Sequence, residues 1–320
     1  MGRYIIRRLL WLVLVLLLIT LFTFLIFYKL TPDPVAQFAG KQPTPALKRE
    51  IREQLGLDKP LAEQYVSFIQ RTFTGDEYGW PGLGFSYDTR TPVKPELLER
   101  TWVTFQLAIG GAVVWLLLGI PIGIVSALKR RTLADRLAMG FALFGVSAPV
   151  FFLGLVALYV FWQTLGILPG TGYVPFGENP MDWLGHFILP WFVLALLYAA
   201  FYARMIRGNL IETMSEDYIR TARAKGLPER TVIGKHALRS SLTPVVTMFG
   251  MDLGLLLGGA LITETVFNLP GLGIWVVQSV ANSDFPVVVA VTLAAAFAIT
   301  FMNLVVDILY AYLDPRVRYS

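Results

Sequence analysis

The stretch TWVTFQLAIGGAVVWLLLGIPIGIVSAL, residues 101–128, decides the fold class of this chain. It contains no Asp, Glu, Lys or Arg, and it exceeds the ~20 apolar residues that an α-helix needs to cross a ~30 Å hydrocarbon core. Similar uncharged runs lie before and after it. Transmembrane β-barrels instead have segments of alternating polarity, which this sequence lacks. We therefore predict an all-α polytopic membrane protein.

The amino-acid composition leads to the same fold class and excludes several functions. Only 15% of the 320 residues are charged and 55% are hydrophobic, whereas a soluble domain has about 25% charged residues. The net charge of +5 does not indicate nucleic acid as a partner, because Lys and Arg gather on the cytoplasmic loops of membrane proteins. The chain has no cysteine, and His186 and His236 are its only histidines. We therefore predict no metal site and no thiol nucleophile.

The uncharged runs predict six transmembrane helices. The first run is too long for the apolar core of a secretory signal peptide, and no small-residue cleavage site follows it, so we interpret it as an uncleaved span. Asp252 interrupts the fifth run and Glu264 ends it. The six predicted spans are residues 9–30, 101–128, 137–163, 187–207, 242–264 and 285–308.

Basic residues alternate between the loops, and this alternation predicts the orientation of the chain in the membrane. The connections 165–186 and 265–284 contain no Lys or Arg. By the positive-inside rule, the loops rich in Lys and Arg are cytoplasmic. Both termini are therefore predicted to be cytoplasmic, with residues 1–8 as the N-terminal segment. The basic residues that decide this are Lys129, Arg130, Arg131, Arg136, Arg204, Arg207, Arg220, Arg223, Lys225, Arg230, Lys235, Arg239, Arg316 and Arg318.

Residues 31–100 form a large predicted extracytoplasmic loop between the first two spans. Its basic residues do not contradict this orientation, because long translocated loops escape the charge rule. The loop is too long to be a simple connector. It could cap the outer mouth of a pathway, contact a partner or bind a ligand, or it could be a packed lid without chemistry.

The cytoplasmic segment 208–241 has the pattern of an elbow made of two short helices. Ile211, Met214, Tyr218 and Ala222 recur at three- and four-residue spacing, which predicts one helix face. Gly226 is typical of a residue that ends a helix in the left-handed conformation, and the nearby Pro228 suits the first turn of a second helix. The elbow could dock on a partner, or its basic face could meet anionic lipid.

The sequence DYIRTARAKGL, residues 217–227, resembles the cytoplasmic signature of permeases from binding-protein-dependent ABC importers, in the oligopeptide, dipeptide and nickel group. One departure is Thr221-Ala222-Arg223, which stands where the general importer signature has Glu-Ala-Ala. Four further pieces resemble the same group and follow its order along the chain. They are Tyr4–Leu10, Leu55–Leu61, Phe267–Gly273 and Leu313–Arg318.

This resemblance implies a type I importer permease with MetI-like architecture, in which residues 101–320 are the permease core and 31–100 the large loop before it. The implied activity is import of di- or oligopeptides that a solute-binding protein hands over, with nickel chelates or oligosaccharides as alternative cargo. The implied location is the inner membrane of a bacterial or archaeal cell. The implied partners are a second, related permease, two cytosolic ATPase subunits and the solute-binding protein, besides membrane lipids.

The resemblance also implies that ATP and Mg are bound by the ATPase subunits, so that this chain is no enzyme and holds no cofactor or catalytic residue. The sequence agrees, because it contains no G-x-x-x-x-G-K-[ST] phosphate-binding loop. The resemblance identifies the elbow as the coupling segment that docks on an ATPase. Its residues are Asp217, Tyr218, Arg220, Thr221, Ala222, Arg223, Ala224, Lys225, Gly226 and Leu227.

Asp252 is the candidate residue of the translocation pathway, because ionisable groups inside a span usually face a bundle interior or an aqueous cavity. It could meet a substrate amine, or it could pair with a Lys or Arg of this chain or a neighbouring subunit. Gly250, Gly254 and Gly258 form a small-residue face on the same span, suited to close helix packing and to contact with a partner permease.

Two other classes of protein remain as alternatives. An ion-gradient-driven secondary transporter would show paired broken helices in inverted repeats and more carboxylates at the bilayer midplane, and the sequence has no clear internal repeat. A membrane-embedded enzyme would need clustered ligands or nucleophiles, which the predicted spans lack.

Overall fold

The computed structural model of the chain describes residues 2–29, 35, 44–54 and 57–313. The regular elements in these residues are all helices, and pairing between extended segments is limited there to two isolated bridges. Outside the described residues lie part of the predicted loop, part of the motif that begins at Leu55, and the predicted cytoplasmic Arg316 and Arg318.

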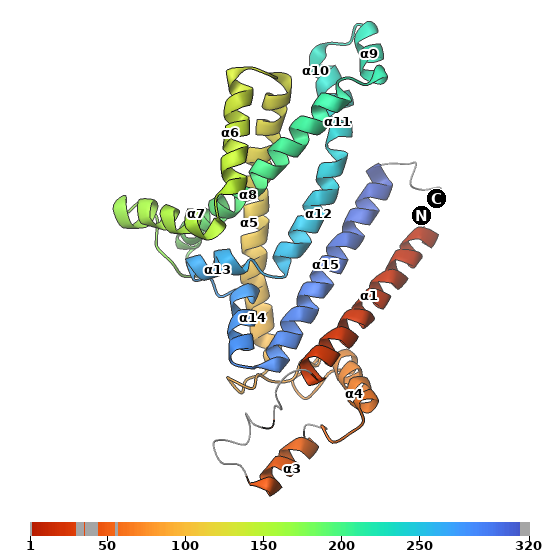
Figure 1. Cartoon of the computed structure of the whole chain (residues 1–320), viewed down its shortest axis with the longest axis vertical. Helices are drawn as coiled ribbons and strands as arrows, with labels where there is room; N and C mark the ends of the chain where they lie inside the picture. The colour runs from red at the N-terminus through yellow and green to blue at the C-terminus, as the bar shows by residue number, and fades with distance from the viewer. Residues whose placement is uncertain (1, 30–34, 36–43, 55–56, 314–320) are drawn as a thin grey trace.

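Figure 1 shows the helices as a bundle of long elements with short helices at both ends. The long elements are α1 (Gly2–Lys29), α5 (Val93–Leu128), α6 (Leu133–Ser147), α8 (Pro180–Thr213), α12 (Thr243–Leu257) and α15 (Phe285–Leu313). The shorter ones are α3 (Pro45–Gln54), α4 (Leu61–Thr74), α7 (Val150–Ala157), η1 (Leu158–Thr164), α9 (Asp217–Ala224), α10 (Glu229–Thr231), η2 (Val232–Ala237), α11 (Leu238–Ser241), α13 (Leu261–Phe267) and α14 (Leu272–Ala281).

Among the described residues, four helices are long and apolar enough to cross a membrane. They contain the segments Ile6–Ile26, Val93–Leu128, Pro180–Thr213 and Phe285–Val306. Two bent pairs also pass this test, so the number of spans reaches six when each bent pair counts as one. The all-α membrane fold is therefore confirmed, and the predicted six spans correspond to the upper end of this range.

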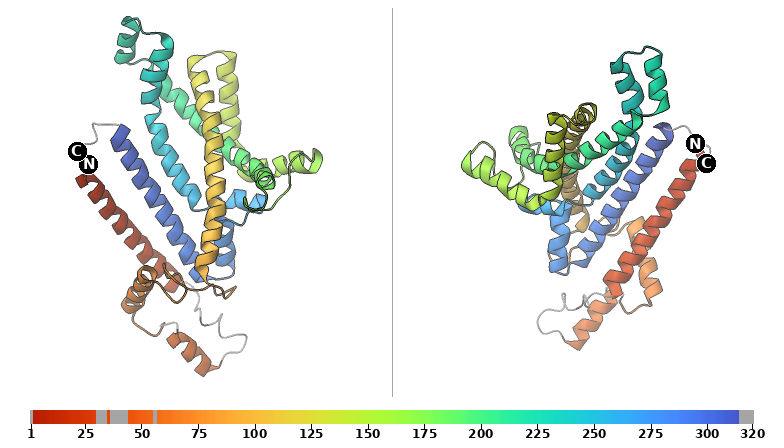
Figure 2. Two further views of the ribbon diagram at one scale, coloured as in Figure 1. Left: turned by 180° about the vertical axis from the view of Figure 1, so that it is seen from behind. Right: turned by 45° about the horizontal axis from the view of Figure 1, so that its top comes forward.

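Two of the predicted spans are not single helices, and a proline explains the first of the two breaks. The run 137–163 forms α6 and then α7 with η1, bent by 102°. Ala148 is extended because Pro149 follows it, and a residue before proline is disfavoured in the helical conformation. Both views in Figure 2 show α7 (yellow-green) pointing away from the long helices. The run 242–264 contains α12 but leaves the helix after Leu257, and α13 begins at Leu261.

The core lies where α5, α8 and α12 meet. Its largest fully buried side chains include Trp115, Tyr202 and Phe187. A second buried cluster joins the start of α5 to α14 and α15 through Val93, Leu272 and neighbouring residues. These aliphatic and aromatic side chains hold together helices that are far apart in the sequence.

The predicted small-residue face of α12 packs against α15 of the same chain. A Cβ atom on Gly250 would lie 1.7 Å from Val306 Cγ2, and one on Gly254 would lie 3.2 Å from the Cα of Ile299 and the Cβ of Met302. The two helices approach this closely because glycine has no side chain. An intrachain contact therefore occupies the face, and the suggestion that a partner permease meets it there is wrong.

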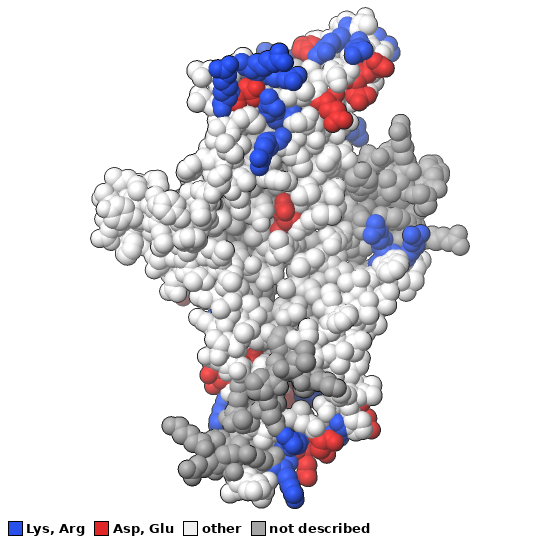
Figure 3. Space-filling model, in the orientation of Figure 1, with Lys and Arg blue, Asp and Glu red and all other residues white. Residues whose placement is uncertain are grey.

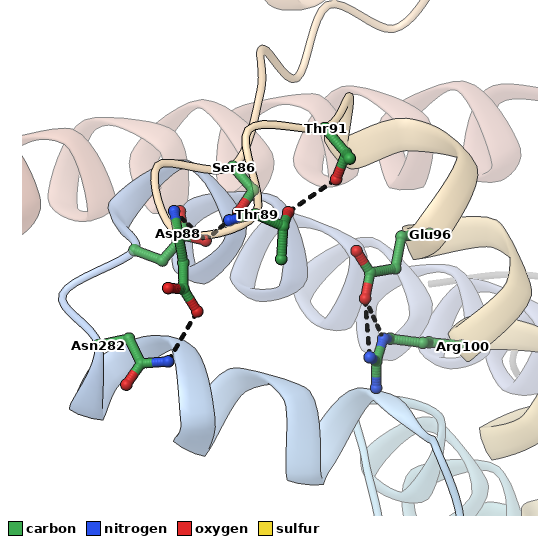
Figure 4. Close-up of polar contacts among 8 residues, drawn as sticks. Ser86, Asp88, Thr89, Thr91, Glu96, Arg100 and Asn282 are labelled. Atoms are coloured by element: carbon green, nitrogen blue, oxygen red, sulfur yellow. Dashed lines mark hydrogen bonds and ion pairs between the residues drawn. The ribbon is translucent and has the colours of Figure 1, made fainter. Parts of the chain in front are cut away.

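The segment between α4 and α5 is fastened to the connection between α14 and α15. Buried Asp284 accepts hydrogen bonds from the Ser86 hydroxyl and from the Tyr87 amide, the latter at 2.9 Å. Asn282 donates to the Asp88 carboxylate at 2.7 Å, as Figure 4 shows. The same view shows the ion pair between Glu96 and Arg100 on α5. Residues 86–88, near the C-terminal end of the predicted loop 31–100, are thus hydrogen-bonded to the bundle.

Charge is distributed unevenly along the molecule. On the face drawn in Figure 3, charged side chains concentrate at the two ends, and the band between them is largely uncharged apart from a central acidic patch and basic side chains at its right edge. The turn before α6 contributes the exposed Lys129, Arg130 and Arg131. This arrangement suits a protein whose middle is solvated by hydrocarbon and whose ends are in water.

Replacing Gly254 with Leu tests the contact between α12 and α15. We expect the variant to lower the melting temperature of the purified protein, because overpacking a tight contact costs about 1–3 kcal/mol. Gly140→Leu on α6 is the matched control, since nothing lies within 4 Å of the position that its Cβ would take. Equal melting temperatures for the two variants would contradict the close contact.

Candidate functional site

The predicted coupling segment lies in a protrusion formed by α9, α10, η2 and α11, at the top of Figure 1. Helix α8 ends at Thr213, and α9 begins at Asp217. After α9 the chain turns at Gly226 and enters the second arm, which continues through α11 into α12. The first arm is α9, and the second arm consists of α10, η2 and α11. From here on, the elbow means these two arms and the turn between them, residues 217–241 of the predicted segment 208–241.

Gly226 produces the turn of the elbow. Its φ is +74°, a left-handed conformation in which a residue with a side chain is strained. The Gly226 amide donates to the Arg223 carbonyl at 2.9 Å, and the Leu227 amide donates to the Ala222 carbonyl at 3.4 Å. This pair of bonds is the Schellman motif that ends many helices. Pro228 then precedes α10 and its carbonyl accepts from the Thr231 amide at 2.8 Å.

One face of the elbow is buried against the body of the protein. Ile219 and Ala222 on α9 pack with Leu210 on α8 and with Val232 and Ala237 on the second arm. The three- and four-residue spacing predicted Tyr218 on this face, and that prediction is wrong, since 45% of Tyr218 is exposed and Ile219 is fully buried. Helix α8 stops before α9 begins, so the spacing that starts at Ile211 does not continue into α9.

The opposite face of the elbow is exposed and charged. Of the ten predicted coupling residues, Ala222 is buried and the others are exposed. Arg223 on α9 forms an ion pair with Glu229 at 2.6 Å, which links the two arms across the turn. Its hydrogen bond to Glu229 raises the pKa of Arg223 above the usual value. Arg220 pairs more loosely with Asp217, at 3.3 Å. Because these pairs are exposed, their contribution to stability is small.

A partly buried ion pair anchors the helix that leads into the elbow. Asp135 at the start of α6 accepts two hydrogen bonds from the Arg207 guanidinium on α8, at 2.7 and 3.0 Å. It also accepts from the Ser126 hydroxyl at 2.5 Å and from the Arg131 amide at 2.8 Å. These bonds join α5, α6 and α8 immediately before the protrusion. This pair was not predicted, although Asp135 is the one acidic residue among Lys129, Arg130, Arg131 and Arg136 in the sequence.

A second buried carboxylate, Glu264, also accepts several hydrogen bonds. Glu264 on α13 is inaccessible to solvent. It accepts from the Thr104 hydroxyl at 2.9 Å, from the Ile274 amide at 3.0 Å and from the Ala260 amide at 3.2 Å. Glu264 therefore ties α5, α13 and α14 together, and its role is structural.

Asp252 differs from these two carboxylates because it is only half-buried. It lies on α12, and its Oδ2 accepts a hydrogen bond from the Tyr202 hydroxyl at 2.7 Å. Among the described residues, no Lys or Arg forms an ion pair with it. The elbow and Asp252 are thus two separate sites, joined by the continuous path of the second arm and α12.

Residues 119–319 match a protein family described as the binding-protein-dependent transport system inner membrane component. Residues 1–108 match the N-terminal part of the membrane components of such systems. The chain belongs to this family. The predicted family, permeases of binding-protein-dependent ABC importers, is thereby confirmed.

Two relatives show that the likeness extends over nearly the whole chain. A peptide transport system permease protein of Brucella abortus (strain 2308) is 40% identical over 306 residues, covering 96% of each chain. The glutathione transport system permease protein GsiC of Escherichia coli (strain K12) is 40% identical over 320 residues, covering all of both chains.

Solved structures of ABC transporters share the fold. The MetNI methionine ABC transporter in an inward-facing crystal form aligns with a TM-score of 0.55 and 18% identity, over 70% of this chain and 98% of the other. An amino acid ABC transporter solved with histidines aligns with a TM-score of 0.51 and 16% identity, over 70% of this chain and 94% of the other. The MetI-like permease fold is therefore confirmed.

Replacing Ile219 with Ala tests how firmly the elbow is held. Truncating a buried Ile typically costs about 2–5 kcal/mol, so we expect the amide protons of α9 to exchange with solvent much faster than in the unmodified protein. Tyr218→Ala is the neighbouring control, which removes an exposed side chain and should leave exchange in α9 nearly unchanged. Similar protection in both variants would show that the buried contact does not fix the elbow.

Proposed function

We propose that this chain is a permease subunit that imports di- or oligopeptides in an ATP-driven transporter of the bacterial or archaeal inner membrane. The main support is the 40% identity over the full chain to relatives named for peptide and glutathione transport. Nickel chelates and oligosaccharides are the alternative cargoes.

In this proposal, energy reaches the chain through the elbow. Two cytosolic ATPase subunits bind ATP and Mg, and one of them receives the exposed face of α9 and the turn at Gly226. A second, related permease completes the pathway, and a solute-binding protein delivers the peptide to the outer side. Both termini and the elbow are then cytoplasmic, and residues 31–100 are extracytoplasmic. The basic loops identified in the sequence support this orientation.

The elbow has the properties that a coupling element needs. Its buried face, with Ile219 and Ala222, is continuous with α8 and α5 through Leu210, Ile124 and Ala127. A displacement of the exposed face would therefore move the helices of the core, as in other switches that work by rigid-body rotation at an interface. An amphipathic helix lying on lipid would instead turn its apolar side to the membrane, whereas the apolar side of α9 packs on the protein.

Peptide import is tested by reconstituting the chain with its partner permease, ATPases and binding protein in liposomes. We expect labelled peptide to accumulate inside only when ATP is supplied to the ATPase side. Dissipating the ion gradients with ionophores should leave accumulation unchanged. Uptake that needs an ion gradient and no ATP would favour the secondary-transporter alternative, and uptake of oligosaccharides in place of peptides would change the cargo.

Replacing Gly226 with Val tests the coupling role of the elbow. The left-handed conformation costs a residue with a side chain roughly 1–2 kcal/mol, so the turn should be displaced although nothing lies within 4 Å of the added Cβ. We expect the complex to assemble and hydrolyse ATP while import falls about tenfold.

Gly177→Val before α8 is the matched control for Gly226→Val. Gly177 also has nothing within 4 Å of its added Cβ, and its φ is not positive. Assembly, ATP hydrolysis and import should all stay near those of the unmodified complex. Normal import by the Gly226→Val complex would contradict the coupling role of the turn.

A further inference from the structure

Asp252 lies beside a cluster of aromatic rings from three helices. Tyr202 on α8 donates its hydroxyl hydrogen to the carboxylate at 2.7 Å. The Trp115 ring on α5 stacks on Tyr198 of α8, with centroids 4.6 Å apart. It also contacts Tyr202 and Phe249 at centroid distances of 6.1 and 6.0 Å. Phe249 and Asp252 are three residues apart on α12 and thus share a face.

This cluster has fully buried members and partly exposed members. Trp115 and Tyr202 are fully buried, whereas Asp252, Tyr198 and Phe249 are half-buried. A ligand would therefore contact the Asp252 carboxylate and the side chains of Tyr198 and Phe249. The buried Trp115 and Tyr202 pack against these residues and fix their positions.

The carboxylate of Asp252 has acceptor capacity to spare. An ionised carboxylate offers about four lone-pair sites, and in the described part of the chain Asp252 uses one, for the neutral donor Tyr202. By contrast, Asp135 accepts four hydrogen bonds, two of them from Arg207. An acidic group at membrane depth needs a cationic or polar partner, so the open side of Asp252 is where a cation would be stabilised.

We propose that Asp252, together with Tyr198 and Phe249, binds the α-ammonium group of the peptide as it passes through the permease. This inference rests on the proposed function. A primary ammonium carries three hydrogen-bond donors on a compact charge, which suits one free carboxylate oxygen, and aromatic ring faces attract cations by about 0.5–2 kcal/mol. A metal ion fits poorly, because Mg²⁺ and Ca²⁺ take six or more oxygen ligands and the site offers one carboxylate.

The test is a double-mutant cycle between the residue and the substrate. Import by the complete importer in liposomes is measured for a peptide with uncharged side chains and for its N-acetylated form, each with the unmodified chain and with Asp252→Asn. The substituted amide keeps the size of the side chain and an acceptor for Tyr202. The effect of Asp252→Asn on import of the free-amine peptide is divided by its effect on import of the acetylated peptide. Any preference of the binding protein for a free amine is the same with the unmodified and the substituted permease, so it cancels in this quotient.

We expect Asp252→Asn to lower import of the free-amine peptide about 3- to 30-fold and to change import of the acetylated peptide less than about twofold. Glu178→Gln removes an exposed acidic charge before α8 and should leave both rates unchanged. Equal losses for the two peptides, or no loss for either, would overturn the inference. Failure of the unmodified importer to carry any peptide would instead overturn the proposed function.

A second measurement covers the case in which the binding protein does not deliver the acetylated peptide. If Asp252 binds substrate, the Asp252→Asn complex should copurify with its partners and melt at the same temperature as the unmodified complex, while importing the free-amine peptide more slowly. If Asp252 pairs with a Lys or Arg of the second permease, the variant should lose partner subunits or melt at a lower temperature. That result would overturn the inference in favour of a structural ion pair.

Discussion

The constraint on which the rest of this structure depends is the cost of an unsatisfied polar group in hydrocarbon. Helices satisfy their own backbone, and an all-helical bundle follows from that requirement. Buried side-chain charges obey the same rule, because an ion taken out of water without a partner costs several kcal/mol. Asp135 accepts from the Arg207 guanidinium, the Ser126 hydroxyl and the Arg131 amide. Glu264 accepts from one hydroxyl and two backbone amides. Each carboxylate thereby fixes the relative positions of several helices.

These polar anchors explain how the protein combines a rigid core with two specialised ends. The Asp135–Arg207 pair holds α5, α6 and α8 together just before the elbow. At the other end, Asp284 holds the segment before α5 against the start of α15. Buried polar contacts are often no more stabilising than apolar packing, but they are specific, since each carboxylate accepts only from a donor in the right direction. In this bundle they define which helix ends move together.

The sequence predicted the parts of the fold that depend on local pattern. Uncharged length predicted the helices, and Gly226 with Pro228 predicted the elbow, because left-handed helix ends and proline-led helix starts are local properties. The buried face of α9 was predicted wrongly by one residue, since the helical period restarts after α8 ends. The 102° bend after α6 has a local cause in Pro149, but its angle depends on packing. The pairing of Asp135 with Arg207, 72 residues apart, leaves no periodic signal at all.

The two candidate sites lie on one covalent path, and this sets a physical condition on how they would work together. The second arm of the elbow continues through α11 into α12, with a bend of 45° at the start of α12. Asp252 lies on α12, and that helix is packed tightly on α15 through Gly250 and Gly254. If the elbow moved alone, the bend would absorb the motion and Asp252 would stay in place. Transmission to Asp252 therefore requires α12 and α15 to move as one body, and their close contact at Gly250 and Gly254, where α12 adds no side chain, supplies the stiffness for it.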